Sequence, residues 1–201
     1  MDPVSEKQTD KSIYGDNLPK MEKVLADVER RISEIRERIT AECGMDPIEH
    51  FLTRIKSDES MREKCRHLGL AETSENALTE IYDAIGVRIV CAFLDDVYLI
   101  KDYLTEMEGY VVIREKDYIK NAKPNGYRSY HMIVQSESGL YCEIQLRTIS
   151  MDTWAALEHH MKYKKNITGN EELISNELKR CADELASTDI SMQAIKKLIM
   201  T

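Results

Sequence analysis

Residues 140–147 alternate between apolar and functional side chains, and this alternation constrains the fold more than any other feature of the chain. The apolar positions are Leu140, Cys142, Ile144 and Leu146. The positions between them are Tyr141, Glu143, Gln145 and Arg147. Because successive side chains of a β-strand point to opposite faces, the segment predicts a strand with one face in a core and the other lined by functional groups. The alternative is a solvated sheet face whose charges pair across strands.

Four other segments predict neighbouring strands. Residues 85–93 read IGVRIVCAF, and a continuous apolar run of this length is typical of a buried strand. Residues 110–116 and 128–135 have strand composition, and a turn at 137–139 predicts that 128–135 and 140–148 form an antiparallel hairpin. Residues 51–56 are interpreted as extended.

Helical patterns surround these strands. An amphipathic helix is predicted from Pro19 to Gly44, and its heptad-like apolar stripe also suits contact with another subunit. The stripe consists of Met21, Val24, Leu25, Val28, Ile32, Ile35 and Ile39. Shorter helices are predicted at 58–68, from a cap at Asp95 to Gly109, and at 150–163. A second long amphipathic helix, or a broken pair, is predicted over 171–200.

These elements predict an α+β fold, with a mixed sheet of about five strands flanked by helices and long amphipathic helices at both ends. The predicted organisation is a flexible segment 1–17, one sheet domain with its N-terminal helix at 18–165, and a helical extension at 166–201.

Charge and cysteine content narrow the function classes. The net charge is -8, a balance that disfavours stable binding to nucleic acid or anionic membranes. No apolar run is long enough for a membrane-spanning helix, and the polar start is unlike a secretory signal. The five cysteines show no metal-binding spacing, so Cys91 and Cys142 are predicted to be buried thiols in a reducing, cytoplasmic protein.

Two carboxylates and one arginine suggest a metal and phosphate site. Asp83 precedes the 85–93 strand, and Arg88 lies inside it among apolar residues. A buried charge must be paired or must serve a ligand. Asp83 and Glu143 on neighbouring strands suit Mg²⁺, with Arg88 on phosphate. The alternative is an internal Arg88–Asp83 salt bridge.

A basic segment precedes these strands. Arg54 and Lys56 point the same way in an extended segment, and Ser60 and Lys64 share one helix face. Such a set suits a polyphosphate. The alternative is a solvated basic surface.

The loop 123–128 reads KPNGYR, and Tyr127 offers a ring on which a base can stack. The alternative is an ordinary core aromatic. The Glu158, His159 and His160 run is better explained as a helix surface than as a metal site, because adjacent helical residues point about 100° apart.

Five stretches, in order, resemble the synthetase domain of the RelA/SpoT family of (p)ppGpp synthetases. They are TRIKSDES, YDAIGVRIVCAF, KDYIKNAKPNGYRSYH, EIQLRT and MDTWAALEHHMKYK, within about residues 48–165. The resemblance implies a nucleotidyltransferase-like domain that acts as a GTP diphosphokinase in the stringent response. Such an enzyme moves the β,γ-diphosphate of ATP to the ribose 3′-oxygen of GDP or GTP and releases AMP. No His-Asp dipeptide is present, so the chain looks like a small, stand-alone synthetase.

The resemblance also implies residue roles. The ATP phosphates would be held by Arg54, Lys56, Ser60, Lys64 and Arg88. Asp83 and Glu143 would bind Mg²⁺, with Glu143 also the candidate base. The GDP/GTP site would be lined by Lys123, Asn125, Tyr127 stacked on guanine, His131, Gln145 and Asp152. His131 and Arg147 would lie near the acceptor phosphates or be structural. Asp152 stands where some small synthetases have Asn, a difference that bears on acceptor preference.

Two alternative functions share the same fold: a toxin-type relative that diphosphorylates another acceptor, such as a tRNA 3′ end, and a non-catalytic nucleotide sensor. A homo-oligomer is predicted from the two apolar helix stripes, and the resemblance favours a tetramer with an allosteric alarmone site.

Overall fold

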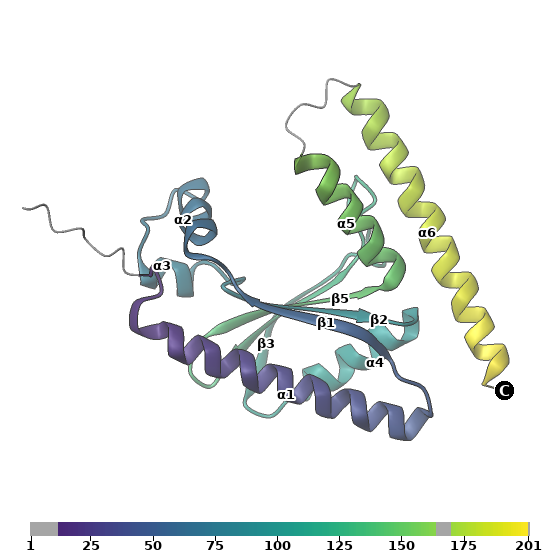
Figure 1. Cartoon of the computed structure of the whole chain (residues 1–201), viewed down its shortest axis with the longest axis horizontal. Helices are drawn as coiled ribbons and strands as arrows, with labels where there is room; N and C mark the ends of the chain where they lie inside the picture. Colours follow the sequence, from purple (N-terminus) through teal and green to yellow (C-terminus); the bar gives the residue numbers. More distant parts are fainter. Residues whose placement is uncertain (1–11, 164–169, 201) are drawn as a thin grey trace, which may run out of the picture.

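The computed structural model describes residues 12–163 and 170–200. Five strands form one mixed sheet in the order β1-β2-β5-β4-β3 (Figure 1). The strands are β1 (Ile48–Ile55), β2 (Ile85–Cys91), β3 (Tyr110–Asp117), β4 (Tyr130–Ser136) and β5 (Tyr141–Thr148). β5 pairs parallel to β2 and antiparallel to β4, so the predicted hairpin and the α+β class are both confirmed.

The helices occupy both faces of this sheet. They are α1 (Leu18–Cys43), α2 (Asp58–His67), α3 (Ser74–Thr79), α4 (Leu94–Thr105), α5 (Ile149–Tyr163) and α6 (Glu171–Ile199). α1 and α4 cover one face, and α5 and α6 rise from the other side at the end of β5 (Figure 1). None of the described helices is both long and apolar enough to cross a membrane.

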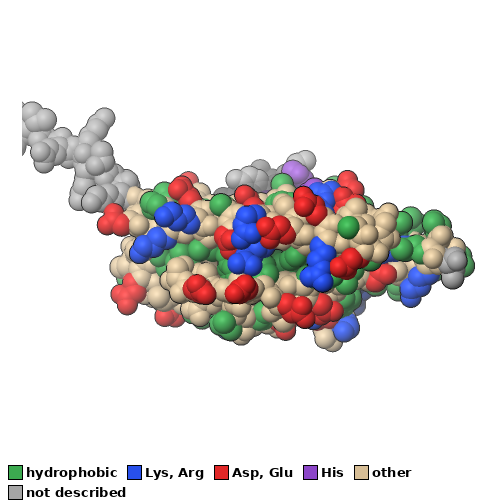
Figure 2. All heavy atoms as spheres, turned by 90° about the horizontal axis from the view of Figure 1, so that it is seen from below, with side chains coloured by type: hydrophobic (Ala, Val, Ile, Leu, Met, Phe, Trp, Pro, Cys, Tyr) green, Lys and Arg blue, Asp and Glu red, His purple; other side chains and the backbone are tan. Residues whose placement is uncertain are grey.

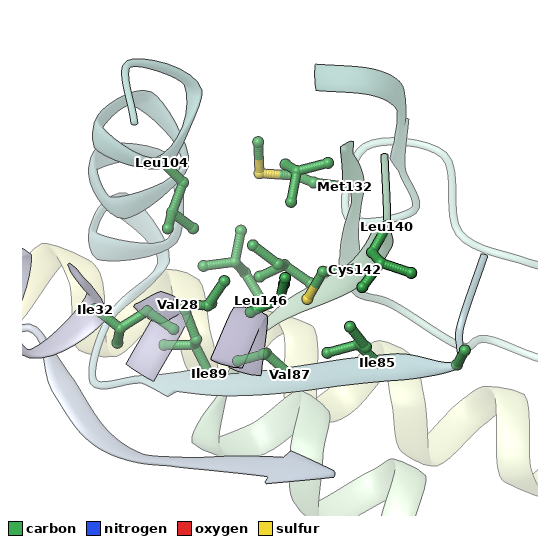
Figure 3. Packing of buried hydrophobic residues seen from close by; sticks show 14 of the residues in the cluster. Val28, Ile32, Ile85, Val87, Ile89, Leu104, Met132, Leu140, Cys142 and Leu146 are labelled. Atoms are coloured by element: carbon green, nitrogen blue, oxygen red, sulfur yellow. The ribbon is translucent and has the colours of Figure 1, made fainter. Parts of the chain in front are cut away.

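The core lies between the sheet and the α1–α4 pair. Ile144 and Leu146 of β5 are fully buried there, as the alternation in 140–147 predicted. Val28 and Ile32 of α1 and Leu104 of α4 point toward Val87, Ile89 and Leu146 (Figure 3). Each such large apolar side chain contributes about 1.5–3 kcal/mol when it leaves water.

The stripe of α1 is used within the chain. Met21, Val28 and Ile32 are fully buried in its own core. Pro19 lies in the first turn, and Gly44 ends the helix in the left-handed region at φ 72°. The suggestion that this stripe serves another subunit is therefore wrong for most of its length.

On the face seen in Figure 2, acidic and basic side chains intermingle.

Several local predictions need correction. β1 begins at Ile48, before the predicted 51–56 segment, and the short helix α3 was not predicted. Asp95 is not the cap of α4, because Asp96 accepts the hydrogen bond from the Phe93 N–H at 3.1 Å. Both acidic side chains instead bind Lys196 of α6.

The predicted flexible segment 1–17 lies largely outside the described residues. Within the described part, Ile13 and Tyr14 are buried and Gly15–Asn17 forms a 3-10 helix, so the prediction is wrong there. The predicted boundary at 165/166 also falls outside the described residues. Cys91 and Cys142 are buried free thiols, as predicted, and burial raises the pKa of Cys142 to about 12.

Candidate active site

The functional side chains lie on the face of the sheet opposite the α1–α4 core, in two rungs set by strand register. One rung runs through Arg54, Gly86, Glu143, Ile133 and Arg114. The next runs through Leu52, Arg88, Gln145, His131 and Lys116. Residues from five separate stretches of sequence thus meet because each occupies the same face of its strand.

The first corner of the site surrounds Asp83. Its Oδ2 lies 2.6 Å from Lys64 Nζ and 3.0 Å from Lys56 Nζ. Burial acts to raise the pKa of Asp83, but the hydrogen bonds from Lys64 and Lys56 outweigh it, so the pKa is lowered. Lys56 is therefore not part of a solvated basic surface.

The backbone of this corner is held from two sides. Ser57 caps α2 by accepting the Ser60 N–H at 3.3 Å, which places Ser60 in the first turn of the helix. Buried Tyr14 donates its hydroxyl to the Lys56 carbonyl at 2.7 Å. A helix N-terminus that directly follows Lys56 is suited to phosphate oxygens, and Lys64, in the last turn of the same helix, adds a second cation beside Asp83.

Glu143 is the second carboxylate of the site. Gln145 Nε2 donates to its Oε2 at 2.9 Å, and His131 Nδ1 lies 3.4 Å from its Oε1. Burial acts to raise the pKa of Glu143, while His131 and Gln145 lower it more, so Glu143 is a carboxylate at neutral pH. The negative charge of Asp83 is near enough to oppose this lowering.

Arg88 does not form the internal salt bridge with Asp83 that was the alternative to a phosphate role. Its NH1 lies 3.4 Å from Asp152 Oδ1, and its Nε is buried without a hydrogen-bond partner among the described residues. Burial, the charge of Arg147 and the charge of Arg54 all lower the pKa of Arg88. A cation in such surroundings gains by meeting an anion, which favours the phosphate role.

Arg147 is the most buried cation of the site, with 5% of its surface exposed. It donates to Asp152 Oδ1 at 3.0 Å, to Gln145 Oε1 at 2.9 Å and to the Tyr127 hydroxyl at 2.9 Å. It therefore links three predicted acceptor-site residues.

Tyr127 is half-buried and faces polar groups, so it is not an ordinary core aromatic. Its hydroxyl lies 2.9 Å from His131 Nε2. Lys123 Nζ lies 4.7 Å from the ring centroids of both Tyr127 and Tyr118. Asn125 accepts the Tyr127 N–H at 3.2 Å and donates to Glu158 at 3.3 Å, so it shapes the loop.

A cavity of about 390 Å³ extends from the Asp83 corner past Glu143 to Lys123 of the loop that carries Tyr127, although Tyr127 itself does not line it. Its lining includes Lys64, Asp83, Lys123, His131 and Glu143. It also includes Arg114, Lys116 and Tyr118, to which no site role was given from the sequence. The sequence carried a signal for two of them: residues 114 and 116 alternate along the end of β3, so they share one face of the sheet, and Tyr118 directly follows the strand.

The residues present fit a divalent cation bound by two carboxylates and substrate. Asp83 Oδ1 is buried and has no hydrogen-bond partner among the described residues. An oxygen in that state is a ready ligand for Mg²⁺, which takes one or two carboxylates and completes its shell with water and phosphate. Within the described part of the chain, no group of three or more His, Cys, Asp or Glu side chains is arranged to hold a metal ion.

The lowered pKa of Asp83 predicts an acid-sensitive fold. Since the folded pKa lies below the ordinary value of 3.8, the ionised carboxylate stabilises the fold above that value. The stabilisation is lost as the pH falls through the folded pKa. Urea unfolding between pH 7 and acid pH is expected to show a smaller loss for Asp83→Asn than for the wild type. Parallel curves for the two proteins would contradict this.

The fold and the site together define a class. One open sheet face carries cations and two carboxylates beside a cavity, and a loop with an aromatic ring lies next to it, the arrangement expected of an enzyme that handles nucleotides. Residues 53–168, more than half of the chain, match the family described as a region found in RelA/SpoT proteins. The chain belongs to the RelA/SpoT family, as the motifs predicted.

Known proteins align with this chain over most of its length. GTP pyrophosphokinase YwaC of Bacillus subtilis is 38% identical over 177 residues, which cover 85% of this chain and 84% of YwaC. GTP pyrophosphokinase YjbM of the same organism is 33% identical, over 83% of this chain and 80% of YjbM. The crystal structure of small alarmone synthetase 1 from Bacillus subtilis bound to its product pppGpp has a TM-score of 0.77 and 30% identity, with 92% of this chain and 96% of that chain covered.

Proposed function

We propose that this chain is a (p)ppGpp synthetase, a GTP diphosphokinase that acts in the stringent response in the cytoplasm. It transfers the β,γ-diphosphate of ATP to the ribose 3′-hydroxyl of GDP or GTP. The observation that supports this most is the cavity that both Asp83 and Glu143 line together with Lys64, Lys123 and His131, in a chain whose relatives over most of its length are GTP pyrophosphokinases.

The acceptor 3′-oxygen attacks the β-phosphorus of ATP, the bond from that phosphorus to the α,β-bridging oxygen breaks, and AMP leaves. The protein contributes alignment and charge neutralisation, because phosphoryl transfer needs little covalent chemistry from it. Lys56, Lys64 and the α2 N-terminus with Ser60 hold donor phosphates, joined by Arg54 and Arg88 from neighbouring strands.

Asp83 and Glu143 would hold Mg²⁺, which supplies charge neutralisation at the phosphates. Glu143 is a carboxylate at neutral pH and lies beside His131, which supports its role as the acceptor of the 3′-hydroxyl proton. Its lowered pKa makes it a weak base, and a proton passed on to water or His131 completes the transfer.

On the acceptor side, Tyr127 stacks on guanine, and Lys123 and Asn125 flank it. His131, Gln145 and Asp152 line the remainder of the site. Asp152 is engaged by Arg147 at 3.0 Å and Arg88 at 3.4 Å, so guanine recognition by this carboxylate competes with both guanidinium groups.

Product analysis tests the function. The purified chain is incubated with ATP, Mg²⁺ and, separately, GMP, GDP, GTP and uncharged tRNA. A guanosine tetra- or pentaphosphate with matching AMP is expected. Label transferred only to tRNA would identify the toxin-type reaction, and nucleotide binding without AMP in any tube would identify a sensor.

Replacing Tyr127 by Ala is expected to raise the KM for GDP by about 5- to 150-fold, because stacking of a base on an aromatic ring contributes about 1–3 kcal/mol. The KM for ATP should change little. Tyr98→Phe, which removes a hydroxyl from a different ring, serves as the control. An unchanged KM for GDP would remove Tyr127 from the acceptor site.

We also propose a homo-oligomer, with a tetramer as the expected assembly and an alarmone as its allosteric regulator. The support is the outer face of α6, where Ile190, Leu198 and Ile199 are 63%, 79% and 72% exposed. Light scattering of the purified chain tests this, and a monomeric mass would refute it.

A further inference from the structure

The loop that carries Tyr127 is seated directly on α6. Gly126 has φ +90°, and a Cβ at this position would lie 2.6 Å from Ala182 Cβ and 3.2 Å from Lys179 Cα. Both the backbone angle and the contact exclude a larger residue without movement of the loop or helix. The loop backbone therefore rests on the turn of α6 formed by residues 179–182.

Arg128, the residue after Tyr127, forms hydrogen bonds with the same part of α6. Its NH1 donates to the Gly126 carbonyl at 3.1 Å and to the Ala182 carbonyl at 3.3 Å. Its NH2 donates to Asp183 Oδ1 at 2.9 Å. Tyr127 is thus held between two neighbours that both contact α6.

Trp154 of α5 contacts both α6 and Tyr127. Its Nε1 donates to the Leu178 carbonyl of α6 at 2.8 Å, and its ring centroid lies 6.4 Å from that of Tyr127. One indole therefore touches both α6 and the ring proposed to stack on guanine. It is also the only tryptophan of the chain, so its fluorescence reports on this region.

The far half of α6 is fixed to the sheet domain by buried polar contacts. Thr148, the last residue of β5, donates to Asp189 at 2.6 Å. Gln193 accepts the Asp95 N–H at 3.0 Å, and Lys196 lies 2.6 Å from Asp96. Hydrogen bonds are directional, so these contacts set the rotation and axial position of the helix, which apolar packing alone leaves free to slide.

α6 lies outside the residues 53–168 that match the family. It also lies at the opposite end of the sheet from α2, which contributes Ser60 and Lys64 to the proposed ATP site near Asp83 (Figure 1). Near the site, α6 contacts Gly126 and Arg128, the two residues on either side of Tyr127.

We propose that α6 is a positioning element for the acceptor site: it sets the place of Tyr127 through Gly126 and Arg128, and so controls affinity for the guanine nucleotide without acting on ATP. The proposal rests on the proposed function for the identity of the acceptor. Arg128, Ala182 and Asp183 are positioning residues, because they act through Tyr127.

The test enlarges Ala182. In Ala182→Leu the added atoms meet the Gly126 backbone, while helix propensity is retained. The KM for GDP is expected to rise about tenfold or more, because small misplacements of a binding group carry large penalties. The KM for ATP should stay within about twofold, and the emission of Trp154 should shift without nucleotide. Ala26→Leu, the same change at an exposed position of α1, should behave as wild type with an unchanged mass by light scattering.

Asp183→Asn provides a second variant that keeps the fold if Ala182→Leu does not, since Asp183 is exposed and loses only its charge. It should raise the KM for GDP by a smaller factor, again without effect on ATP. Equal changes in both KM values, or no change in either variant, would overturn the proposal. Titration of GDP against Trp154 fluorescence gives the same comparison without turnover. A wild type that binds GDP but releases no AMP would therefore refute the proposed function alone.

Discussion

Replacing Glu143 by Gln is expected to reduce AMP release by about 10²–10⁴-fold, the range typical of losing a general acid or base. Asp83→Asn is expected to have a comparable effect for a different reason. It removes the oxygen charge that Mg²⁺ requires, although the amide keeps the shape of the side chain. In both variants the hydrogen bonds from neighbouring groups are retained in part, so the fold should persist.

The measurement is AMP release with ATP, Mg²⁺ and GDP, together with circular dichroism and thermal unfolding of each variant. Glu37→Gln, at an exposed position of α1, is the matched control and should retain full activity. Wild-type rates in both Asp83→Asn and Glu143→Gln would refute the metal and base assignments, whereas loss in only one would assign the essential carboxylate to that position.

Arg147→Met is expected to lower the free energy of unfolding by about 3 kcal/mol, at the lower end of the range for breaking a buried charge pair from one side. Arg147 is 5% exposed, and its guanidinium donates hydrogen bonds to Asp152, Gln145 and the Tyr127 hydroxyl. For a chain of this length, that loss corresponds to roughly 6–12 °C in Tm.

Arg88→Met is the comparison variant. Arg88 lies on the adjacent strand, and its NH1 is 3.4 Å from Asp152 Oδ1, the carboxylate oxygen that Arg147 contacts at a shorter distance. Its side chain is 36% exposed against 6% for Arg147. Arg88→Met should therefore lose ATP-dependent transfer with a much smaller fall in Tm. Equal losses of Tm in the two variants would show that Arg147 is no more structural than Arg88.

The sheet was predictable because strand periodicity is a local property. The alternation at 140–147 assigned Ile144 to the core, which is confirmed, and placed Glu143 on the opposite face, where it lines the cavity. The hairpin followed from its turn. The short helix α3 was missed because six residues carry too little periodic signal.

The site was predictable as a set of residues but not as a set of contacts. The pairing of Asp83 with Lys56 and Lys64, in place of Arg88, depends on where α2 lies relative to β2. Arg114 and Lys116 entered the cavity lining through the register of β3 with β4, although their alternation was visible in the sequence.

The sequence by itself determined the α+β class, the faces of the strands, the family and many of the residues proposed for the site. These follow from side-chain periodicity and short motifs, which are local. Only the tertiary structure decided that the apolar stripe of α1 is buried in the core of its own chain, and that α6 packs against the loop that carries Tyr127. Those outcomes depend on contacts between residues as distant as Asp96 and Lys196, 100 positions apart. Such contacts are set by the packing of whole elements, and no local pattern encodes the partner that each side chain will meet.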